Sequence, residues 1–174
     1  MGPQEERVPK PQPRSLRARF PWKYVEFHPR VRDSISGAEI AYLRDVENIL
    51  VVDDDSHFRE IIERVIRRSH ACSVNTAATE AEAWEQVTQG PCDLVLLDLY
   101  IDGKKSWDTL KRIGSLPDAP PVILVSCEDT KENLEYAKSL GVVDFLPKPI
   151  DFARLKSTVD AALLKKREER ASRA

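Results

Sequence analysis

Five short strand-like runs, separated by segments with helical character, constrain the fold of this chain most strongly. Each run is four to six residues long, which suits a strand and is far too short to span a bilayer. The runs are 49-ILVV-52, 72-CSVNT-76, 93-DLVLLD-98, 122-VILV-125 and 142-VVDFL-146. The segments between them carry apolar residues at helical spacing, and two of these segments end at a glycine, Gly114 and Gly141.

This alternation predicts an α/β protein with five strands and five helices. Most of the runs are apolar throughout, as expected for strands buried on both faces of a parallel sheet. Helices must then cover both faces, which gives a five-stranded, doubly wound architecture. We expect the folded domain to span residues 48–164, which is long enough to bury a core of its own.

The two ends of the chain differ from its centre in charge and composition. Residues 1–32 carry eight Lys or Arg against three Asp or Glu, whereas residues 48–164 carry 13 against 20. Six of the twelve prolines fall within the first 29 residues. We therefore expect residues 1–47 to form a Pro- and Arg-rich, largely extended and flexible extension, with a candidate short helix near 38–46. Residues 165–174 are expected to form a charged tail.

Composition also narrows the function classes. No zinc-finger, helix-turn-helix or aromatic RNA-binding motif is present, and the central region is acidic, so nucleic acid is not an expected partner. No apolar stretch of the signal-peptide kind follows the N-terminal charges, and we expect no insertion into a membrane. The three cysteines are scattered and lack metal-ligand spacing, which favours reduced thiols and a cytoplasmic location. They are Cys72, Cys92 and Cys127.

Charged and hydroxyl side chains stand where four of the five strands end. They are Asp53, Asp54 and Asp55 after the first strand, Asp98 at the end of the third, Ser126 after the fourth and Lys148 after the fifth. Any one of these alone could be a helix cap or a solvated charge. Because the carboxyl ends of parallel strands border one crevice, the set together predicts a functional site.

Carboxylates gathered in one crevice require a counterion. Two unit charges ~4 Å apart repel by about 4 kcal/mol at an effective dielectric near 20. A hard cation that keeps several waters, such as Mg²⁺, would relieve this repulsion and would also neutralise an incoming phosphoryl group. Asp98, at the end of a buried strand, could then act as the nucleophile, while Lys148 and Ser126 hold phosphoryl oxygens.

These stretches resemble a known family, the receiver domain of two-component response regulators, of the stand-alone type with an N-terminal extension. The matching residues are 49-ILVVDDD-55 with Arg59, 93-DLVLLDL-99, 122-VILVS-126 and 141-GVVDFLPKP-149. The intervals are also typical of the family: Asp54 and Asp98 lie 44 residues apart, and Ser126 and Lys148 lie 22 apart. The resemblance covers residues 48 to about 164.

The resemblance implies a flavodoxin-like strand order and a set of roles. Asp98 would accept phosphate from the phosphohistidine of a sensor histidine kinase or a histidine phosphotransfer protein. Mg²⁺ or Mn²⁺ would be held by Asp53, Asp54, Asp98 and the backbone carbonyl of Tyr100. The chain would then be a signalling protein rather than an enzyme, catalysing only its own phosphoryl transfer and dephosphorylation.

The resemblance also implies a switch. Ser126 and Phe145 would respond to phosphorylation, and the Lys148–Pro149 bond would be cis. The signal would pass to a face built from the helix near 130–140, the last strand and the last helix. That face would bind an unidentified downstream protein or a second copy of the chain.

Three departures from the family fall after the acceptor aspartate and beside the hydroxyl. Ile101-Asp102 replaces Met-Pro, Ser106 stands in place of a glycine after the charged pair Lys104-Lys105, and Cys127 replaces a small residue. They keep open a phosphate-independent pseudo-receiver that acts as an interaction module. A Mg²⁺-dependent phosphatase with an aspartyl-phosphate intermediate is a further alternative. Its second acidic residue would fall at Tyr100, which is not acidic.

Overall fold

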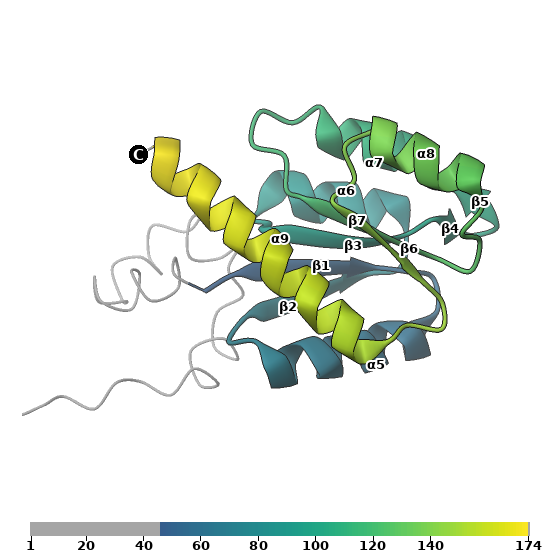
Figure 1. Cartoon of the computed structure of the whole chain (residues 1–174), viewed down its shortest axis with the longest axis horizontal. Coiled ribbons are helices and arrows are strands. Elements are labelled where there is room, and N and C mark those ends of the chain that lie inside the picture. The colour runs from purple at the N-terminus through teal and green to yellow at the C-terminus, as the bar shows by residue number, and fades with distance from the viewer. Residues whose placement is uncertain (1–45, 174) are drawn as a thin grey trace, which may run out of the picture. The chain divides into compact units, whose positions relative to one another are not determined.

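The computed structural model describes residues 46–173 (Figure 1). The elements in chain order are β1 Asn48–Val52, α5 Ser56–Ser69, β2 Ser73–Ala77, α6 Glu80–Gln89, β3 Leu94–Asp98, β4 Tyr100–Ile101, β5 Lys104–Lys105, α7 Trp107–Gly114, β6 Val122–Ser126, α8 Lys131–Ser139, β7 Asp144–Pro147 and α9 Phe152–Arg173. The extension expected over residues 1–47, with its candidate short helix near 38–46, lies outside the described residues except for residues 46 and 47.

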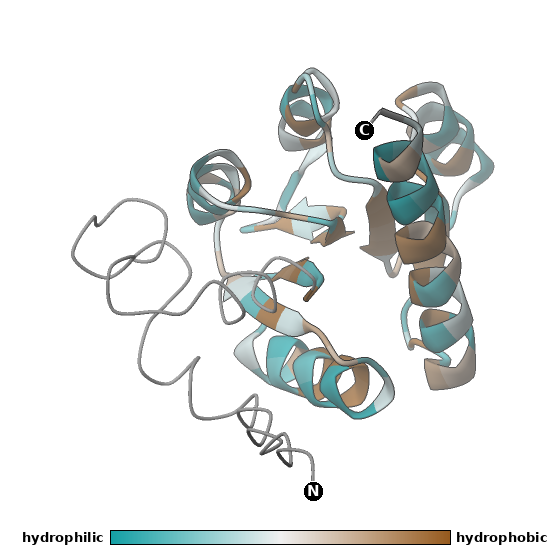
Figure 2. Cartoon of the chain, turned by 90° about the vertical axis from the view of Figure 1, so that its left-hand side faces the viewer, coloured by the Kyte–Doolittle hydropathy of each residue, from teal (hydrophilic) through white to brown (hydrophobic). Residues whose placement is uncertain are grey.

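Five parallel strands form the central sheet, in the order β2-β1-β3-β6-β7. The parallel, doubly wound sheet confirms the prediction from the sequence pattern, and its flavodoxin-like strand order is the one that the family resemblance implied. Helices α5 and α9 cover one face of the sheet, while α6, α7 and α8 cover the other (Figure 2). The strand order reverses beside β1, so the carboxyl ends of β1 and β3 border the crevice expected in such a fold.

Two apolar clusters, one on each face of the sheet, form the core. Alternate residues of β1 point to opposite faces: Ile49 and Val51 pack under α5 and α9, whereas Leu50 and Val52 pack under α6 and α7. All five residues of β1, of β3 and of β6 are buried. This double-sided burial explains why these runs are apolar throughout, and each fully buried Leu or Ile contributes about 1.5–3 kcal/mol.

The carboxylate of Asp55, which follows the end of β1, caps helix α5. Its Oδ1 accepts from the backbone N–H groups of His57, at 2.9 Å, and Phe58, at 3.3 Å. The bonds from Phe58 and His57 lower the pKa of Asp55, so it stays ionised as a cap. The cap fixes the first turn of α5 and with it the position of Phe58.

A short antiparallel hairpin of β4 and β5 follows β3, and the sequence analysis did not predict it. Tyr100 pairs with Lys105, and Ile101 pairs with Lys104. The two connecting residues have positive φ, 52° at Asp102 and 72° at Gly103. An Asp-Gly pair in this conformation suits a two-residue hairpin turn. The hairpin coincides with the stretch in which the sequence departs from the receiver family.

Helix α9 continues to Arg173, through most of the segment that was expected to be a charged tail. Its basic side chains pair with acidic groups at the amino-terminal edge of the sheet. These ion pairs are Lys166–Asp118, Arg167–Glu47 and Arg170–Asp93. Among the helices of residues 46–173, none is both long enough and apolar enough to cross a membrane.

Candidate functional site

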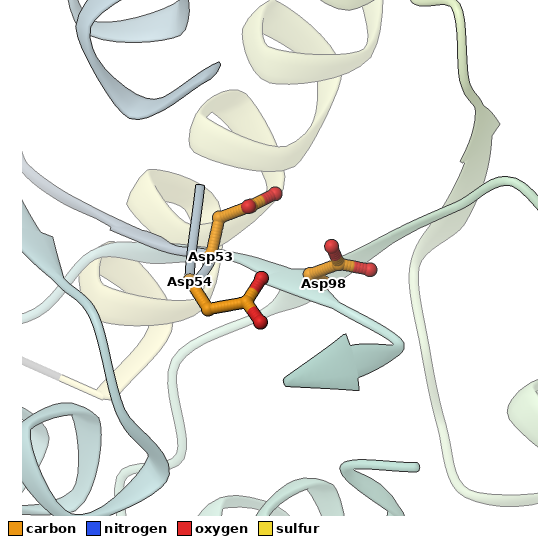
Figure 3. A group of neighbouring side chains, drawn as sticks. All are labelled: Asp53, Asp54 and Asp98. Atoms are coloured by element: carbon orange, nitrogen blue, oxygen red, sulfur yellow. The ribbon is translucent and has the colours of Figure 1, made fainter. Parts of the chain in front are cut away.

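Three carboxylates lie together where strands β1 and β3 end (Figure 3). Asp53 and Asp54 follow β1, and Asp98 is the last residue of β3. They are brought together because β1 and β3 are neighbours, with Val52 opposite Leu97. One oxygen from each carboxylate lies within 4.8 Å of the others. Asp53 is buried, at 1% exposed, whereas Asp54 is exposed, so one end of the cluster is accessible to solvent.

The ammonium group of Lys148 bridges two of these carboxylates. Its Nζ donates to Asp53 Oδ2 and to Asp98 Oδ2, each at 2.6 Å. The side chain is 17% exposed, and burial by itself acts to lower the pKa of Lys148. The bonds to Asp53 and Asp98 outweigh burial and raise the pKa, so the lysine is charged at neutral pH.

Asp53 is the carboxylate most affected by burial. Loss of solvent raises the pKa of Asp53 from 3.8 to about 6, although hydrogen bonds from Lys148 and from the Asp55 backbone N–H oppose the rise. The Asp55 bond to Oδ1 measures 2.9 Å. Asp53 is therefore largely ionised at pH 7 but takes up a proton under mildly acidic conditions.

The hairpin orients the other two carboxylates through its backbone. Tyr100 N–H donates to Asp98 Oδ1, and Asp102 N–H donates to Asp54 Oδ2, both at 3.0 Å. The buried hydroxyl of Ser106 donates to the carbonyl oxygen of Asp98 at 2.6 Å. Ser106 has a φ of −78°, so a glycine is not needed there. The residue that departs from the family pattern thus secures the end of β3.

Ser126, the expected hydroxyl, is buried at the end of β6. Its Oγ accepts from the Glu128 N–H at 2.9 Å, and its carbonyl accepts from the Lys148 N–H at 2.8 Å. Glu128 Oε2 accepts from the Tyr100 hydroxyl at 2.7 Å, and this bond lowers the pKa of Glu128. The hairpin is therefore connected through Glu128 to the hydroxyl at the end of β6.

Phe145, the expected switch aromatic, lies on β7 beside β6. It pairs with Leu124, whereas Ser126 pairs with Pro147. Phe145 is only 8% exposed and packs in the apolar cluster under α6, α7 and α8. The aromatic side chain is therefore already turned inward. The Lys148–Pro149 peptide bond is cis, as expected.

Sequence reasoning missed three residues that touch the site. Ser106 was noted only as a replacement for glycine, and Glu128 was not singled out. Phe58 was taken as a core residue of the first helix, although its ring also faces Lys148, with Nζ 4.1 Å from the ring centroid. Only the position of Phe58, four residues after Asp54 in a capped first turn, could have indicated this contact.

Fold and site together define a class of protein: a doubly wound domain with an acidic cluster and a lysine at the carboxyl ends of its strands. The sequence profile of the response regulator receiver domain matches residues 49–160, so the chain belongs to the receiver-domain family of two-component response regulators. Members of this family interact with histidine kinases.

Curated relatives match the same region. The DNA-binding transcriptional regulator NtrC of Bradyrhizobium sp. (strain RP501 Parasponia) is 32% identical over 70% of this chain and 25% of its own length. The transcriptional regulatory protein ZraR of Escherichia coli (strain K12) is 35% identical over 67% of this chain and 26% of its own. The chain thus spans about a quarter of these relatives. Because one of them is named as DNA-binding, the expectation of no nucleic-acid partner is not confirmed.

Solved structures agree on the fold. The signal receiver domain of a LuxO repressor protein from Vibrio parahaemolyticus aligns with a TM-score of 0.70 at 21% identity, over 74% of this chain and 98% of that one. A CheY-like receiver domain protein from Methanospirillum hungatei JF-1 gives 0.67, also at 21% identity, over 72% and 99%. At this level of identity the likeness establishes the fold alone.

Proposed function

We propose that this receiver domain accepts a phosphoryl group on Asp98 in a reaction that requires Mg²⁺ or Mn²⁺. One observation carries the proposal: Lys148 bridges Asp53 and Asp98 at 2.6 Å each, while Asp54 completes a three-carboxylate cluster. A cluster built only for stability would gain little from three carboxylates around one lysine, because at least one negative charge stays uncompensated.

The donor set fits a hard divalent cation. Carboxylate oxygens suit Mg²⁺, and the exposure of Asp54 leaves room for the waters that Mg²⁺ retains. The hairpin also offers a backbone ligand. The Leu99 carbonyl accepts from the Ser106 N–H across the hairpin. In an antiparallel ladder the next residue points its backbone groups to the opposite side. The amide and carbonyl of Tyr100 therefore point away from the partner strand, on the side of Asp98. Asp53, Asp54, Asp98 and the Tyr100 carbonyl would then hold the ion.

The side chains support an in-line transfer from a phosphohistidine. A carboxylate oxygen of Asp98 forms the new O–P bond as the P–N bond to the donor imidazole breaks, and the leaving nitrogen recovers a proton. Lys148 exchanges its bond to Asp98 Oδ2 for one to a phosphoryl oxygen. The bound cation would neutralise charge on the phosphoryl group. The phosphate donor would be a sensor histidine kinase or a histidine phosphotransfer protein.

The output would pass through the face of α8, β7 and α9. A phosphoryl group on Asp98 offers a new acceptor for the Ser126 hydroxyl. Drawing that hydroxyl inward breaks the bond from the Glu128 N–H and disturbs the loop that leads into α8. Because Phe145 is already buried, this loop rather than a large aromatic swing would carry the change. A downstream protein or a second copy of the chain would bind the altered face.

Acetyl phosphate or beryllofluoride with Mg²⁺ tests the proposal. We expect wild type to gain one phosphoryl mass from acetyl phosphate, and we expect Asp98→Asn to gain none. Asp102→Asn is the matched control, because it removes a carboxylate from the same rim and leaves the Asp102 backbone bond to Asp54. Labelling of the Asp98 variant at the wild-type level would refute the assignment.

The switch is tested separately with Ser126→Ala. This variant should still be labelled on Asp98, but beryllofluoride should no longer shift the NMR signals of residues 130–160. Wild-type shifts in the variant would mean that Ser126 does not couple the site to that face. Wild type that binds neither Mg²⁺ nor beryllofluoride would favour the pseudo-receiver alternative.

A further inference from the structure

The ring of Phe58 covers the ammonium group of Lys148 at the candidate site. Lys148 Nζ lies 4.1 Å from the ring centroid, well within the distance at which an aromatic face attracts a cation. Phe58 reaches this position from the first turn of α5, which Asp55 caps by accepting from the Phe58 N–H. The contact therefore joins α5 to the residue that follows β7.

The ammonium group has three neighbours in the structure, two carboxylates and one aromatic ring. It has three N–H donors, and two of them are used by Asp53 Oδ2 and Asp98 Oδ2. The Phe58 ring lies against the ammonium group as its third neighbour. Because the Lys148 side chain is only 17% exposed, water competes weakly with this contact, which strengthens it relative to one at an open surface.

Binding of a metal ion would change the negative charge that surrounds the Lys148 ammonium group. A metal ion held by Asp53 and Asp98 would share the negative charge of both carboxylate partners of Lys148. When Asp98 is phosphorylated, the lysine must leave Asp98 Oδ2 and find the phosphoryl group. The aromatic face is the one of its three partners that neither event removes.

We propose that Phe58 is a positioning residue that holds the Lys148 ammonium group in the crevice while its carboxylate partners change. This inference rests on the proposed function, because it concerns the same phosphoryl transfer. Phe58 touches neither carboxylate by any hydrogen bond and acts only through the lysine. Its role is to keep the ammonium group where a phosphoryl oxygen will arrive.

The simpler alternative is that Phe58 only fills space. The ring is half-buried and packs against the apolar cluster under α5 and α9, which includes Leu155. A leucine would fill much of that volume but offers no negative aromatic face. The two roles therefore separate when the electrostatics of the ring are changed and its size is kept nearly constant.

The first experiment measures beryllofluoride affinity at saturating Mg²⁺ in the full chain. We expect Phe58→Leu to weaken beryllofluoride binding by about three- to tenfold, the range that a partly desolvated cation–π contact supports. Mg²⁺ affinity without beryllofluoride should not fall. Phe152→Leu is the matched control, since Phe152 is an exposed aromatic at the start of α9 and should leave both affinities unchanged.

The second experiment replaces Phe58 with phenylalanines that carry one, two or three ring fluorines. Fluorination weakens the negative face of the ring while nearly preserving its shape. The logarithm of beryllofluoride affinity should fall stepwise with each fluorine. An unchanged affinity across the series would overturn the positioning role, even if Phe58→Leu is impaired.

A third measurement needs no metal or phosphate. In the metal-free protein, NMR of the Lys148 ammonium protons should show an upfield ring-current shift and slow exchange with water, both of which Phe58→Leu abolishes. The same signal in both proteins would overturn the inference. If wild type shows this signal but binds no beryllofluoride, the proposed function fails. Phe58 would then hold Lys148 where no phosphoryl transfer takes place, and the positioning role would be overturned as well.

Discussion

Lys148 donates to Asp53 and Asp98 at 2.6 Å each, so one positive charge is shared between two of the three clustered carboxylates. A metal ion entering the cluster must share or displace this positive charge. The lysine therefore has two opposed effects on the site. It competes with the cation before phosphoryl transfer, and it stabilises the phosphoryl oxygens afterwards.

We predict that Lys148→Gln separates these two effects. Removing the positive charge leaves Asp53 and Asp98 repelling each other, so Mg²⁺ should bind about tenfold more tightly, consistent with charges ~4 Å apart. Beryllofluoride affinity and labelling by acetyl phosphate should both fall. Calorimetric titration with each ligand measures the two changes, and Lys131→Gln, at an exposed lysine of α8, is the control. Weaker Mg²⁺ binding in the Lys148 variant would contradict the competition.

The raised pKa of Asp53 makes the stability of the metal-free protein depend on pH. Burial raises this pKa from 3.8 to about 6, so the folded state holds a proton that the unfolded state releases. The stability that this proton contributes is fully present below pH 3.8 and is lost as the pH rises through about 6. Above that pH, the ionised carboxylate is a cost to the fold unless a cation shares it.

We therefore predict that Asp53→Asn stabilises the chelator-treated protein at pH 7.5, by about 1–3 kcal/mol given the size of the shift. The advantage over wild type should shrink as the pH falls through 6 toward 4. Urea unfolding at several pH values measures it. Asp102→Asn, at an exposed carboxylate, should show no such trend. A constant difference between Asp53→Asn and wild type at every pH would contradict the assignment to Asp53.

The hairpin of β4 and β5 is the element that ties the site together. Its backbone donates to Asp54 and Asp98, and the Tyr100 hydroxyl donates to Glu128. Gly103 makes the turn possible, with a φ of 72° that other L-residues rarely adopt. A Cβ at this position would meet nothing within 4 Å, so any cost of substitution is conformational rather than steric.

We predict that Gly103→Ala lowers the free energy of unfolding by about 1 kcal/mol and weakens Mg²⁺ binding, because the turn positions the amide that orients Asp54. Gly114→Ala is the matched control. Gly114 is the last residue of α7 and has no positive φ, so alanine there should be neutral or slightly stabilising. Equal effects from the two substitutions would show that the hairpin turn is not strained by alanine.

The sequence predicted the five strands of the sheet and their helices because apolar runs such as 94-LVLL-97 are buried on both faces and leave a strong pattern. It also placed Asp53, Asp98 and Lys148 at one crevice, since strand ends follow directly from those runs. It did not predict the hairpin, because each strand has only two residues and the Lys104-Lys105 pair carries no apolar alternation. An Asp-Gly pair alone is a local signal that many loops share.

The contact between Phe58 and Lys148 could not be predicted from the sequence, for a different reason. The two residues are 90 positions apart, and nothing in the spacing of α5 distinguishes an aromatic that faces a charge from one that fills the core. Likewise, the end of α9 carries no apolar stripe beyond Leu163 and Leu164, so its continuation to Arg173 could not be found from hydrophobic periodicity. Its partners lie on loops distant in sequence.

The carboxyl-terminal half of α9 contacts the amino-terminal ends of the strands, opposite the site. Arg170 contacts Asp93 Oδ1 at 2.6 Å, and the Asp93 side chain is only 4% exposed. Asp93 Oδ2 in turn accepts from the Asn48 N–H at 2.7 Å, at the start of β1. Lys166, also 4% exposed, pairs with Asp118 at 2.8 Å. Arg167 pairs with Glu47 in the same way. The basic side chains of α9 thus pair with an acidic residue that precedes each of three strands, β1, β3 and β6.

We predict that Arg170→Ala lowers the free energy of unfolding by about 1–2 kcal/mol. The substitution leaves the buried carboxylate of Asp93 without its cationic partner, and the effect falls short of the 3–5 kcal/mol of a fully buried pair because Arg170 is half exposed. Lys131→Ala, which breaks the exposed pair with Glu135, should change stability by less than about 0.5 kcal/mol. Urea unfolding compares the two.

Ending the chain after Leu164 should lower the free energy of unfolding more than either substitution, since it removes the three ion pairs at once. Unfolding curves that superimpose for the truncated and full chains would instead make residues 165–173 the dispensable tail that their charge pattern suggested.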